Sequence, residues 1–376
     1  MRWPAALLNV LLVGLSVALT LGLLELSARL ATQAEWVPAR TLKDFRLRQP
    51  EPYQQEAYFS RDFIAESFRQ PGGWDTPSGT RLVIPRDYAG TFFHVANGQR
   101  RTTDQPATFR HRVWVLGGST VYASEVPDAE TIPSHMQRVL NARTPDTWRV
   151  ENVGASTVTV AQQLERLRTL PVQAGDVVVF YDGVNDILQG VFSNNPDGWM
   201  VQSNRDRLAN QGAVAALALR AHLWLTDHSA LYPQLVHPQS PLPAHLAIEA
   251  TRVRVQQQAT LGYVNALGDA RAWARARGAR FVHVLQPNLG TRARFNAYET
   301  GMLETPFLVP AGSYEALRDT TPLLRRALAD VGLSSTDLTA LFDDSARSPY
   351  LDFCHMSGWG NARVAAAMAD VLALQP

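Results

Sequence analysis

The chain of 376 residues has a single cysteine, Cys354, which excludes an internal disulfide and a zinc site built from several cysteines. It also has almost no excess charge. Its 35 basic and 34 acidic side chains leave a net charge of +1, so no overall positive field points to nucleic acid as a partner. Lysine is nearly absent, because Lys43 is the only one, and we interpret this as a bias of composition rather than as a phosphate-binding feature.

Common motifs for metals and nucleotides are missing as well. The histidines show no His-Glu-x-x-His or similar ligand spacing, so we expect no metal site. The segment Gly117-Gly118-Ser119-Thr120 lacks the Gly-Lys-Ser/Thr ending of a phosphate loop, and the glycines do not fit a dinucleotide fingerprint. We therefore predict a protein that works without a cofactor.

The N-terminus carries a long apolar run, in which the 22 residues from Trp3 to Leu24 include no charge. As a helix this run would be about 33 Å long, enough to cross a hydrocarbon core of about 30 Å. We predict one uncleaved transmembrane helix within residues 1–28. Two alternatives stay open: a cleaved signal peptide, for which Thr32-Gln33-Ala34 is a late cleavage site, and a buried core helix.

The charges that flank this run do not settle its orientation. Arg2 and the terminal amine precede it, whereas Arg29, Arg40 and Lys43 follow it. This count does not favour a cytoplasmic N-terminus by the positive-inside rule, although long domains can cross a membrane regardless of such counts.

Beyond the apolar run, residues 29–109 are expected to be a juxtamembrane segment with a β-hairpin that turns at Asn97-Gly98. From residue 110 to 376, strands and helices alternate, which predicts a three-layer α/β/α sandwich around a parallel sheet. We expect strands over 113–116, 150–153, 177–180 and 281–285, and a further short strand that ends at 341–342. We expect helices over 132–142, 161–170, 256–277, 317–331 and 362–374.

Two insertions interrupt this alternation, at about 187–250 and at about 287–312. The first contains Trp199 and Trp224. Because binding specificity commonly resides on loops, we expect the first insertion to be a lid or a wall of the substrate site.

Small and polar residues follow several of the predicted strands, where functional groups gather in open parallel sheets. Each group by itself is more often a helix cap or a turn than a site. Together they supply a nucleophile, two oxyanion donors and a base oriented by an acid. The four segments are Gly117-Gly118-Ser119-Thr120, Asn152-Val153-Gly154-Ala155-Ser156, Gly183-Val184-Asn185-Asp186 and Asp352-Phe353-Cys354-His355.

In this order, the four segments resemble the conserved blocks of the SGNH (GDSL-type) hydrolases, over about 70% of the chain. The third and fourth blocks match fully. The first departs from the pattern, since Gly118 stands where many members have aspartate and Thr120 where many have an aliphatic residue. The hairpin before residue 110 is similar to a segment of membrane-anchored bacterial members, although that likeness is less specific.

The resemblance implies a role for each residue. Ser119 would be the nucleophile, His355 its general base, and Asp352 the acid that orients the imidazole. The oxyanion would be bound by the backbone amides of Ser119 and Gly154 and by the Asn185 side chain. We expect Cys354 to point away from this site as a small buried side chain.

The resemblance further implies a serine ester hydrolase that forms an acyl-enzyme and removes short acyl groups from a carbohydrate or cell-envelope ester. Its catalytic domain would be membrane-anchored and extracytoplasmic. Two alternatives remain: an O-acyltransferase that acts on a glycan, and a non-catalytic envelope protein that keeps the fold.

Overall fold

The computed structural model describes residues 5–33, 39, 41–69, 74–77, 79–145, 147–193, 213–236 and 243–373. Trp199, which we assigned to the first insertion, lies outside these residues. The chain divides into a smaller unit, Met1–Arg48 with Gln202–Gln239, and a larger unit, Gln49–Val201 with Ser240–Pro376.

The smaller unit contains the apolar helix that the sequence predicts. It comprises α1 (Ala5–Gln33), α2 (Leu42–Leu47), α9 (Ala213–His228) and α10 (Tyr232–Leu235). The stretch Asn9–Thr32 of α1 is long and apolar enough to cross a membrane, and none of its most apolar window is buried. Both an anchor and a signal sequence fit this helix.

The larger unit is built on one mixed sheet, and five of its strands are parallel, as predicted. Its strands are β3 (Tyr88–Ala89), β4 (His94–Ala96), β5 (Gln99–Arg100), β6 (His111–Gly117), β7 (Trp148–Asn152), β8 (Val177–Asp182), β9 (Arg280–Leu285) and β10 (Ser335–Asp337). Their order is β10-β9-β8-β6-β7-β5-β4-β3. The strands from β10 to β7 pair in parallel, whereas β5, β4 and β3 extend the sheet in antiparallel fashion.

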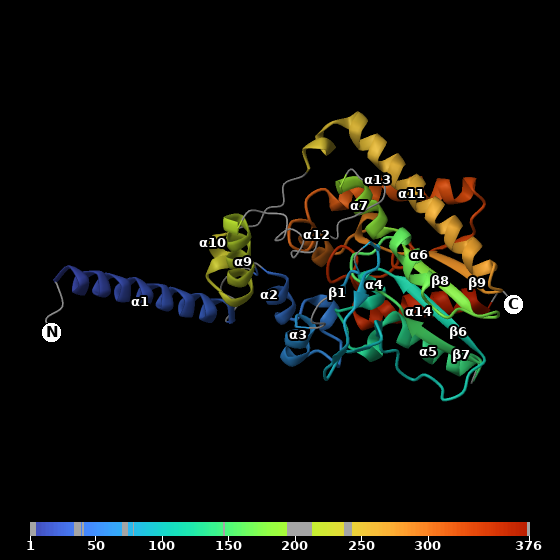
Figure 1. The fold of residues 1–376 in the computed structure, drawn as a ribbon, viewed down its shortest axis with the longest axis horizontal. Coiled ribbons are helices and arrows are strands. Elements are labelled where there is room, and N and C mark those ends of the chain that lie inside the picture. Colours follow the sequence, from blue (N-terminus) through green and yellow to red (C-terminus); the bar gives the residue numbers. More distant parts are fainter. Residues whose placement is uncertain are drawn as a thin grey trace. The chain divides into compact units, whose positions relative to one another are not determined.

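Helices cover both faces of this sheet, which gives the three layers predicted from the sequence (Figure 1). One layer holds α5 (Ile132–Arg143) and α14 (Gly358–Ala373), and the other holds α6 (Val160–Arg168), α7 (Val184–Ser193), α11 (Glu249–Arg275) and α13 (Ser313–Asp330). The remaining elements are short: α3 (Arg61–Ser67), α4 (Ser119–Tyr122), α12 (Ala297–Leu303), and a separate ribbon of β1 (Trp74–Asp75) and β2 (Ile84–Pro85).

Side chains alternate along the central strands, so they fill the hydrophobic layer on each face of the sheet. Trp114, Leu116, Val178 and Phe180 belong to the hydrophobic cluster shared with α6, α7, α11 and α13. The residues between them point to the opposite face, because side chains alternate along a strand. All six residues of β8 are buried, which explains why its sequence reads as an uninterrupted apolar run.

The expected hairpin is present and belongs to the larger unit. Asn97 and Gly98 both have positive φ, 55° and 67°, as a two-residue hairpin turn between β4 and β5 requires. Strand β5 then pairs with β7 through the register Arg100↔Asn152. The segment before residue 110 therefore adds strands to the sheet.

Two sequence-based boundaries differ from the structure. Helix α7 continues to Ser193 with Ile187 and Val191 in the core, so residues 187–193 pack as part of the sandwich. The strand predicted to end at 341–342 is wrong, because the pairing with β9 is made by Ser335–Asp337. This polar segment lies at the sheet edge, where backbone pairing does not need an apolar run.

The strand order also explains where a site can form. Among the parallel strands, the chain starts at β6, crosses to β7 on one side, and then returns to β8 on the other. The connection that follows β6 runs to β7, and the connection that follows β8 runs the opposite way to β9. Ligands of open α/β sheets bind at such a reversal, beyond the carboxyl ends of the strands. Ser119 and Asn185 follow β6 and β8 directly.

Candidate active site

Ser119 lies at a sharp turn from strand to helix. Strand β6 ends at Gly117, and α4 begins at Ser119, which is half-buried. A Cβ on Gly118 would collide with the Asn185 side-chain amide, so glycine here gives Asn185 room beside the turn.

The structure brings together the three residues predicted to be catalytic. His355 Nε2 lies 2.8 Å from Ser119 Oγ. His355 Nδ1 lies 2.9 and 2.8 Å from the two carboxylate oxygens of Asp352. When Nδ1–H donates to Asp352, Nε2 is left to accept the hydroxyl proton of Ser119, which is the arrangement that activates a serine.

The loop that carries Asp352 and His355 is held from two directions. Asp352 Oδ1 accepts hydrogen bonds from the backbone amides of Cys354, at 3.0 Å, and His355, at 2.9 Å. The second insertion contributes as well, since Leu289 N donates to Phe353 O and Phe353 N donates to Leu308 O. The 287–312 segment therefore fixes the loop between the acid and the base.

Opposing effects act on the protonation of His355. Burial by itself would lower its pKa, but the Asp352 carboxylate, followed by Cys354 and Glu125, outweighs burial and raises the pKa well above the ordinary 6.5. The imidazolium that forms when Ser119 loses its proton is thus stabilised by the same carboxylate that orients the ring.

This raised pKa predicts the acid limb of a pH profile. Only neutral His355 can accept a proton, so kcat/KM for a nitrophenyl ester should rise with pH through a midpoint above 6.5. Asp352→Asn removes the main stabilising charge. It should move the midpoint to lower pH and lower kcat by about 10⁴.

Glu125→Gln serves as the graded control for this measurement. It should move the midpoint in the same direction by less, because the influence of Glu125 on the pKa of His355 is weaker than that of Asp352. Identical midpoints in the wild type and Asp352→Asn would contradict the assignment of His355 as the base.

Cys354 is buried, as expected, and packs in the apolar cluster, but it does not point fully away from the site. Its Sγ lies 3.7 Å from His355 Nδ1. The ligand atoms of Asp352, Cys354 and His355 lie within 4.8 Å of one another, as they would in a metal site. Burial raises the pKa of the Cys354 thiol to about 11, and both His355 nitrogens are hydrogen-bonded, so this cluster fits a triad better than a ligand set.

Of the predicted oxyanion donors, Ser119 and Asn185 are well placed. The amide of Ser119 starts α4 and has no intrahelical acceptor. The Asn185 side chain donates one N–H to Val158 O at 3.0 Å, which fixes the amide and leaves its second N–H for a ligand.

The amide of Gly154, the third predicted oxyanion donor, makes a hydrogen bond within its own loop. It donates to Asn152 Oδ1 at 3.0 Å, so that donor is already used. A Cβ on Gly154 would collide with the backbone of Val121 and Tyr122, so glycine allows the β7 loop to pack against α4.

The acids that flank Asn185 support its turn. Asp186 Oδ1 accepts from Val160 N at 3.0 Å, and Asp182 Oδ1 accepts from the Gln163 side chain, which ties the turn to α6. Burial raises the pKa of both carboxyls, and the proximity of Asp186 adds to the rise at Asp182.

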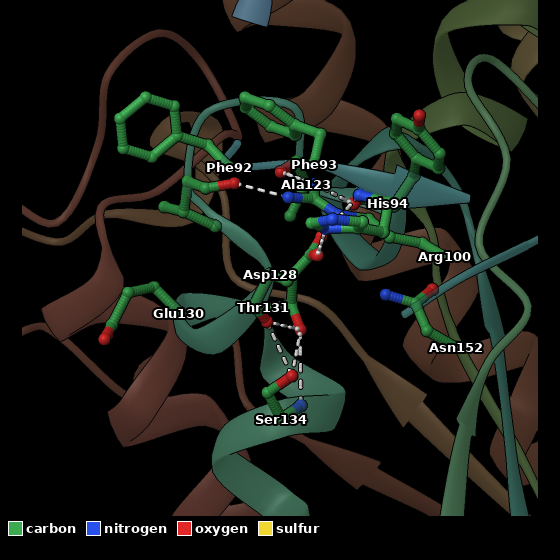
Figure 2. Close-up of polar contacts among 12 residues, drawn as sticks. Phe92, Phe93, His94, Arg100, Ala123, Asp128, Glu130, Thr131, Ser134 and Asn152 are labelled. Carbon is green, nitrogen blue, oxygen red and sulfur yellow. Dashed lines mark hydrogen bonds and ion pairs between the residues drawn. The ribbon is translucent and has the colours of Figure 1, made fainter. Parts of the chain in front are cut away.

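Sequence reasoning gave no role to Arg100, whose guanidinium holds the C-terminal end of α4 (Figure 2). This fully buried side chain donates to Tyr122 O at 2.6 Å, to Ala123 O, and to Val126 O at 2.6 Å, and its Nε lies 3.1 Å from Asp128 Oδ1. The last carbonyls of a helix have no intrahelical donors, so Arg100 satisfies groups that would otherwise be buried unpaired.

Asn152 completes this cap. Its side-chain amide donates to Val121 O at 2.9 Å, and it lies directly opposite Arg100 in the β5–β7 pairing. Two register partners thus hold three consecutive carbonyls of the segment that starts at Ser119. The only sequence signal was an arginine two residues after the Asn-Gly turn, and nothing local indicates what it binds.

Arg100→Met tests whether this cap positions the nucleophile. Removing one partner of a buried ion pair should cost about 3–5 kcal/mol in the free energy of unfolding. Because Ser119 would lose its fixed geometry, kcat per folded molecule should also fall while KM changes little. Denaturant unfolding and steady-state kinetics well below the melting temperature separate the two effects.

Asp176→Asn is the control, since Asp176 is also buried and its carboxylate accepts hydrogen bonds from Arg112 N, Trp114 Nε1 and Gln173 N, at the end of β6 away from Ser119. It should lose similar stability and keep its kcat per folded molecule. Equal effects of the two substitutions on kcat would show that Arg100 acts on stability alone.

Comparisons with known proteins give distant similarities in fold. No family model and no curated protein matches this chain. A GDSL-family lipolytic protein from Veillonella parvula is 12% identical (70% of this chain, 98% of the other, TM-score 0.38). A carbohydrate acetylesterase from Sinorhizobium meliloti is 13% identical, and the match covers 70% of this chain and 99% of the other with a TM-score of 0.38. An acetylxylan esterase from Geobacillus stearothermophilus is 14% identical, and the match covers 70% of this chain and 94% of the other with a TM-score of 0.39.

Because these identities and TM-scores are low, the role of each site residue is argued from the interatomic distances within this chain. In its fold the chain is similar to lipolytic proteins of the GDSL family and to esterases of acetylated carbohydrates.

Proposed function

We propose that this protein is a serine ester hydrolase of the SGNH type that needs no cofactor. The observation that carries the proposal is the continuous chain of hydrogen bonds from Ser119 through His355 to Asp352. These residues come from separate parts of the sequence, and their atoms meet at the distances that proton transfer requires. The proposal extends to a membrane-anchored protein whose substrate is a small-molecule or glycan ester.

The reaction proceeds in two halves. Ser119 Oγ bonds to the ester carbonyl carbon while its proton passes to His355 Nε2, and the carbonyl oxygen becomes negative. When the carbon–oxygen bond to the alcohol breaks, His355 returns that proton to the leaving oxygen and an acyl-enzyme remains. Water, deprotonated by His355, then attacks the acyl carbon, and Ser119 leaves with the proton.

Charge on the carbonyl oxygen would be met by the Ser119 amide and the free N–H of Asn185. Donors fixed in advance stabilise such charge most effectively, because they need no reorganisation during the reaction. Asn185 meets this condition, since Val158 O holds its amide.

By the resemblance of its sequence blocks, we propose short acyl groups on a carbohydrate or cell-envelope alcohol as the substrate class. A panel of nitrophenyl esters of increasing chain length, together with acetylated sugars, would identify the acyl group. Adding unacetylated sugars as acceptors distinguishes hydrolysis from transfer, because a transferase would convert the acceptor to its ester instead of releasing acetate.

Acylation of Ser119 is the direct test of the proposed mechanism. A fluorophosphonate probe should label the full-length protein and should not label Ser119→Ala. Ser156→Ala, which removes a serine of the neighbouring β7 loop, should be labelled like the wild type. Equal labelling of wild type and Ser119→Ala would contradict a serine hydrolase.

Asn185→Ala adds a graded outcome to the same experiment. Losing one oxyanion donor typically lowers kcat by about 10²–10³, whereas losing a nucleophile or base costs on the order of 10⁶. This variant should therefore still be labelled, slowly, with KM within a few-fold of the wild type. A loss of stability with an unchanged kcat per folded molecule would make Asn185 a structural residue.

We also propose that α1 remains attached and that the catalytic unit lies outside the cytoplasm. The length of the apolar helix supports the anchor, and the family resemblance supports the side. A C-terminal alkaline phosphatase fusion should be active, and a green fluorescent protein fusion dark. The reverse pattern would place the catalytic unit in the cytoplasm.

A further inference from the structure

Helix α9, within the first insertion, presents an apolar face that is exposed among the described residues. Val214, Leu217 and Trp224 are 83%, 69% and 59% exposed, and Ala218 and Ala221 are exposed as well. These positions recur at intervals of three and four residues, so they form one stripe along the helix. We call these five residues the α9 stripe. A continuous apolar surface of this kind marks a contact with a membrane or with another protein.

The end of α9 is attached to α1 by specific contacts. Glu25 of α1 accepts hydrogen bonds from Ser229 Oγ at 2.6 Å, Ala230 N at 2.8 Å and Leu231 N at 3.1 Å. Arg29, paired with Glu25 at 2.7 Å, donates to the carbonyl oxygen of His228 at 2.6 Å. Residues 228–231, between α9 and α10, are thus fixed to the last two turns of α1.

This attachment point coincides with the end of the uncharged run. Glu25 is the first charged residue after the 22 uncharged residues from Trp3 to Leu24, whose helical length is about that of the hydrocarbon core. When α1 crosses a bilayer, Glu25 and the backbone groups it binds therefore lie at the boundary of the hydrocarbon. Figure 1 shows α9 running across the axis of α1 rather than along it. A helix in that direction lies in the plane of the membrane.

We propose that the α9 stripe rests on the surface of the bilayer that α1 crosses, so that the first insertion is a second membrane contact. Leucine, valine and tryptophan are the side chains that interfacial helices place at the headgroup boundary, and tryptophan is enriched there. The turn of α1 before Glu25 is apolar and uncovered as well, with Leu21 and Leu24 54% and 48% exposed. A bilayer supplies an apolar environment for both surfaces.

Depth-dependent quenching in proteoliposomes tests this proposal on the full-length protein. Leu217→Cys places a thiol on the α9 stripe for labelling with the dye NBD, and Ala221→Cys places one a turn further along. The native Cys354 is 3% exposed and so does not compete for the label. Leu261→Cys is the matched control, because Leu261 is a leucine of α11 in the larger unit with a similar exposure of 60%.

Dye at positions 217 and 221 should be quenched several-fold more by lipids that carry a nitroxide near the headgroup than dye at 261. Quenching by aqueous iodide should show the reverse order. An intact mass that includes residues 1–28 is part of the expected result. Fluorophosphonate labelling, measured on the same samples, reports the esterase proposal separately, so either proposal can fail without the other.

Three results would overturn the lipid contact. Equal accessibility of all three positions to iodide would leave the α9 stripe in water. Protection from iodide without quenching by nitroxide lipid would assign the stripe to a second copy of the chain or another protein. A mature protein that lacks α1 would remove the bilayer from the stripe altogether.

Discussion

The geometry of the candidate site depends on one buried cation. Arg100 satisfies the carbonyls at the end of α4 while Asp128 balances its charge, and the Phe93 ring lies 4.6 Å from the guanidinium carbon. Without these donors, a helix of one turn would leave polar groups buried and unpaired. The hairpin that precedes the parallel sheet therefore takes part in the site, because it carries the side chain that holds the turn of Ser119.

A second constraint acts from the other side of Ser119. The loop with Asp352 and His355 is fixed by its own backbone hydrogen bonds to Asp352 and by the 287–312 segment on either side of Phe353. Burial disfavours a charged imidazole there, and the adjacent carboxylate overcomes that penalty. An imidazole held in one orientation, with a stabilised charged form, is suited to take a proton from Ser119 and return it later in the reaction.

The first insertion was expected to be a lid, and the part of it that forms α9 and α10, within residues 213–236, belongs to the unit of the apolar helix. Its contacts with Glu25 and Arg29 suggest a different use of the same residues. Trp224 has a side chain that suits a substrate wall or a headgroup boundary equally well, and only the position of α9 beside the end of α1 favours the second. An attachment of this kind also depends on α1 remaining in the mature chain.

The sequence by itself determined the local elements and most of the chemistry. The apolar runs of β6 and β8, the Asn97-Gly98 turn and the four blocks around Ser119, Asn185 and His355 depend on neighbours in the chain, so their patterns are readable directly. The tertiary structure decided the features that depend on contacts between residues far apart in the sequence. Gly154 packs against α4 and uses its amide internally, Arg100 reaches from the hairpin to the nucleophile turn, and β10 forms from a polar segment because an edge strand needs only one partner. Such roles follow from which segments the fold brings together, and no local pattern of residues encodes that proximity.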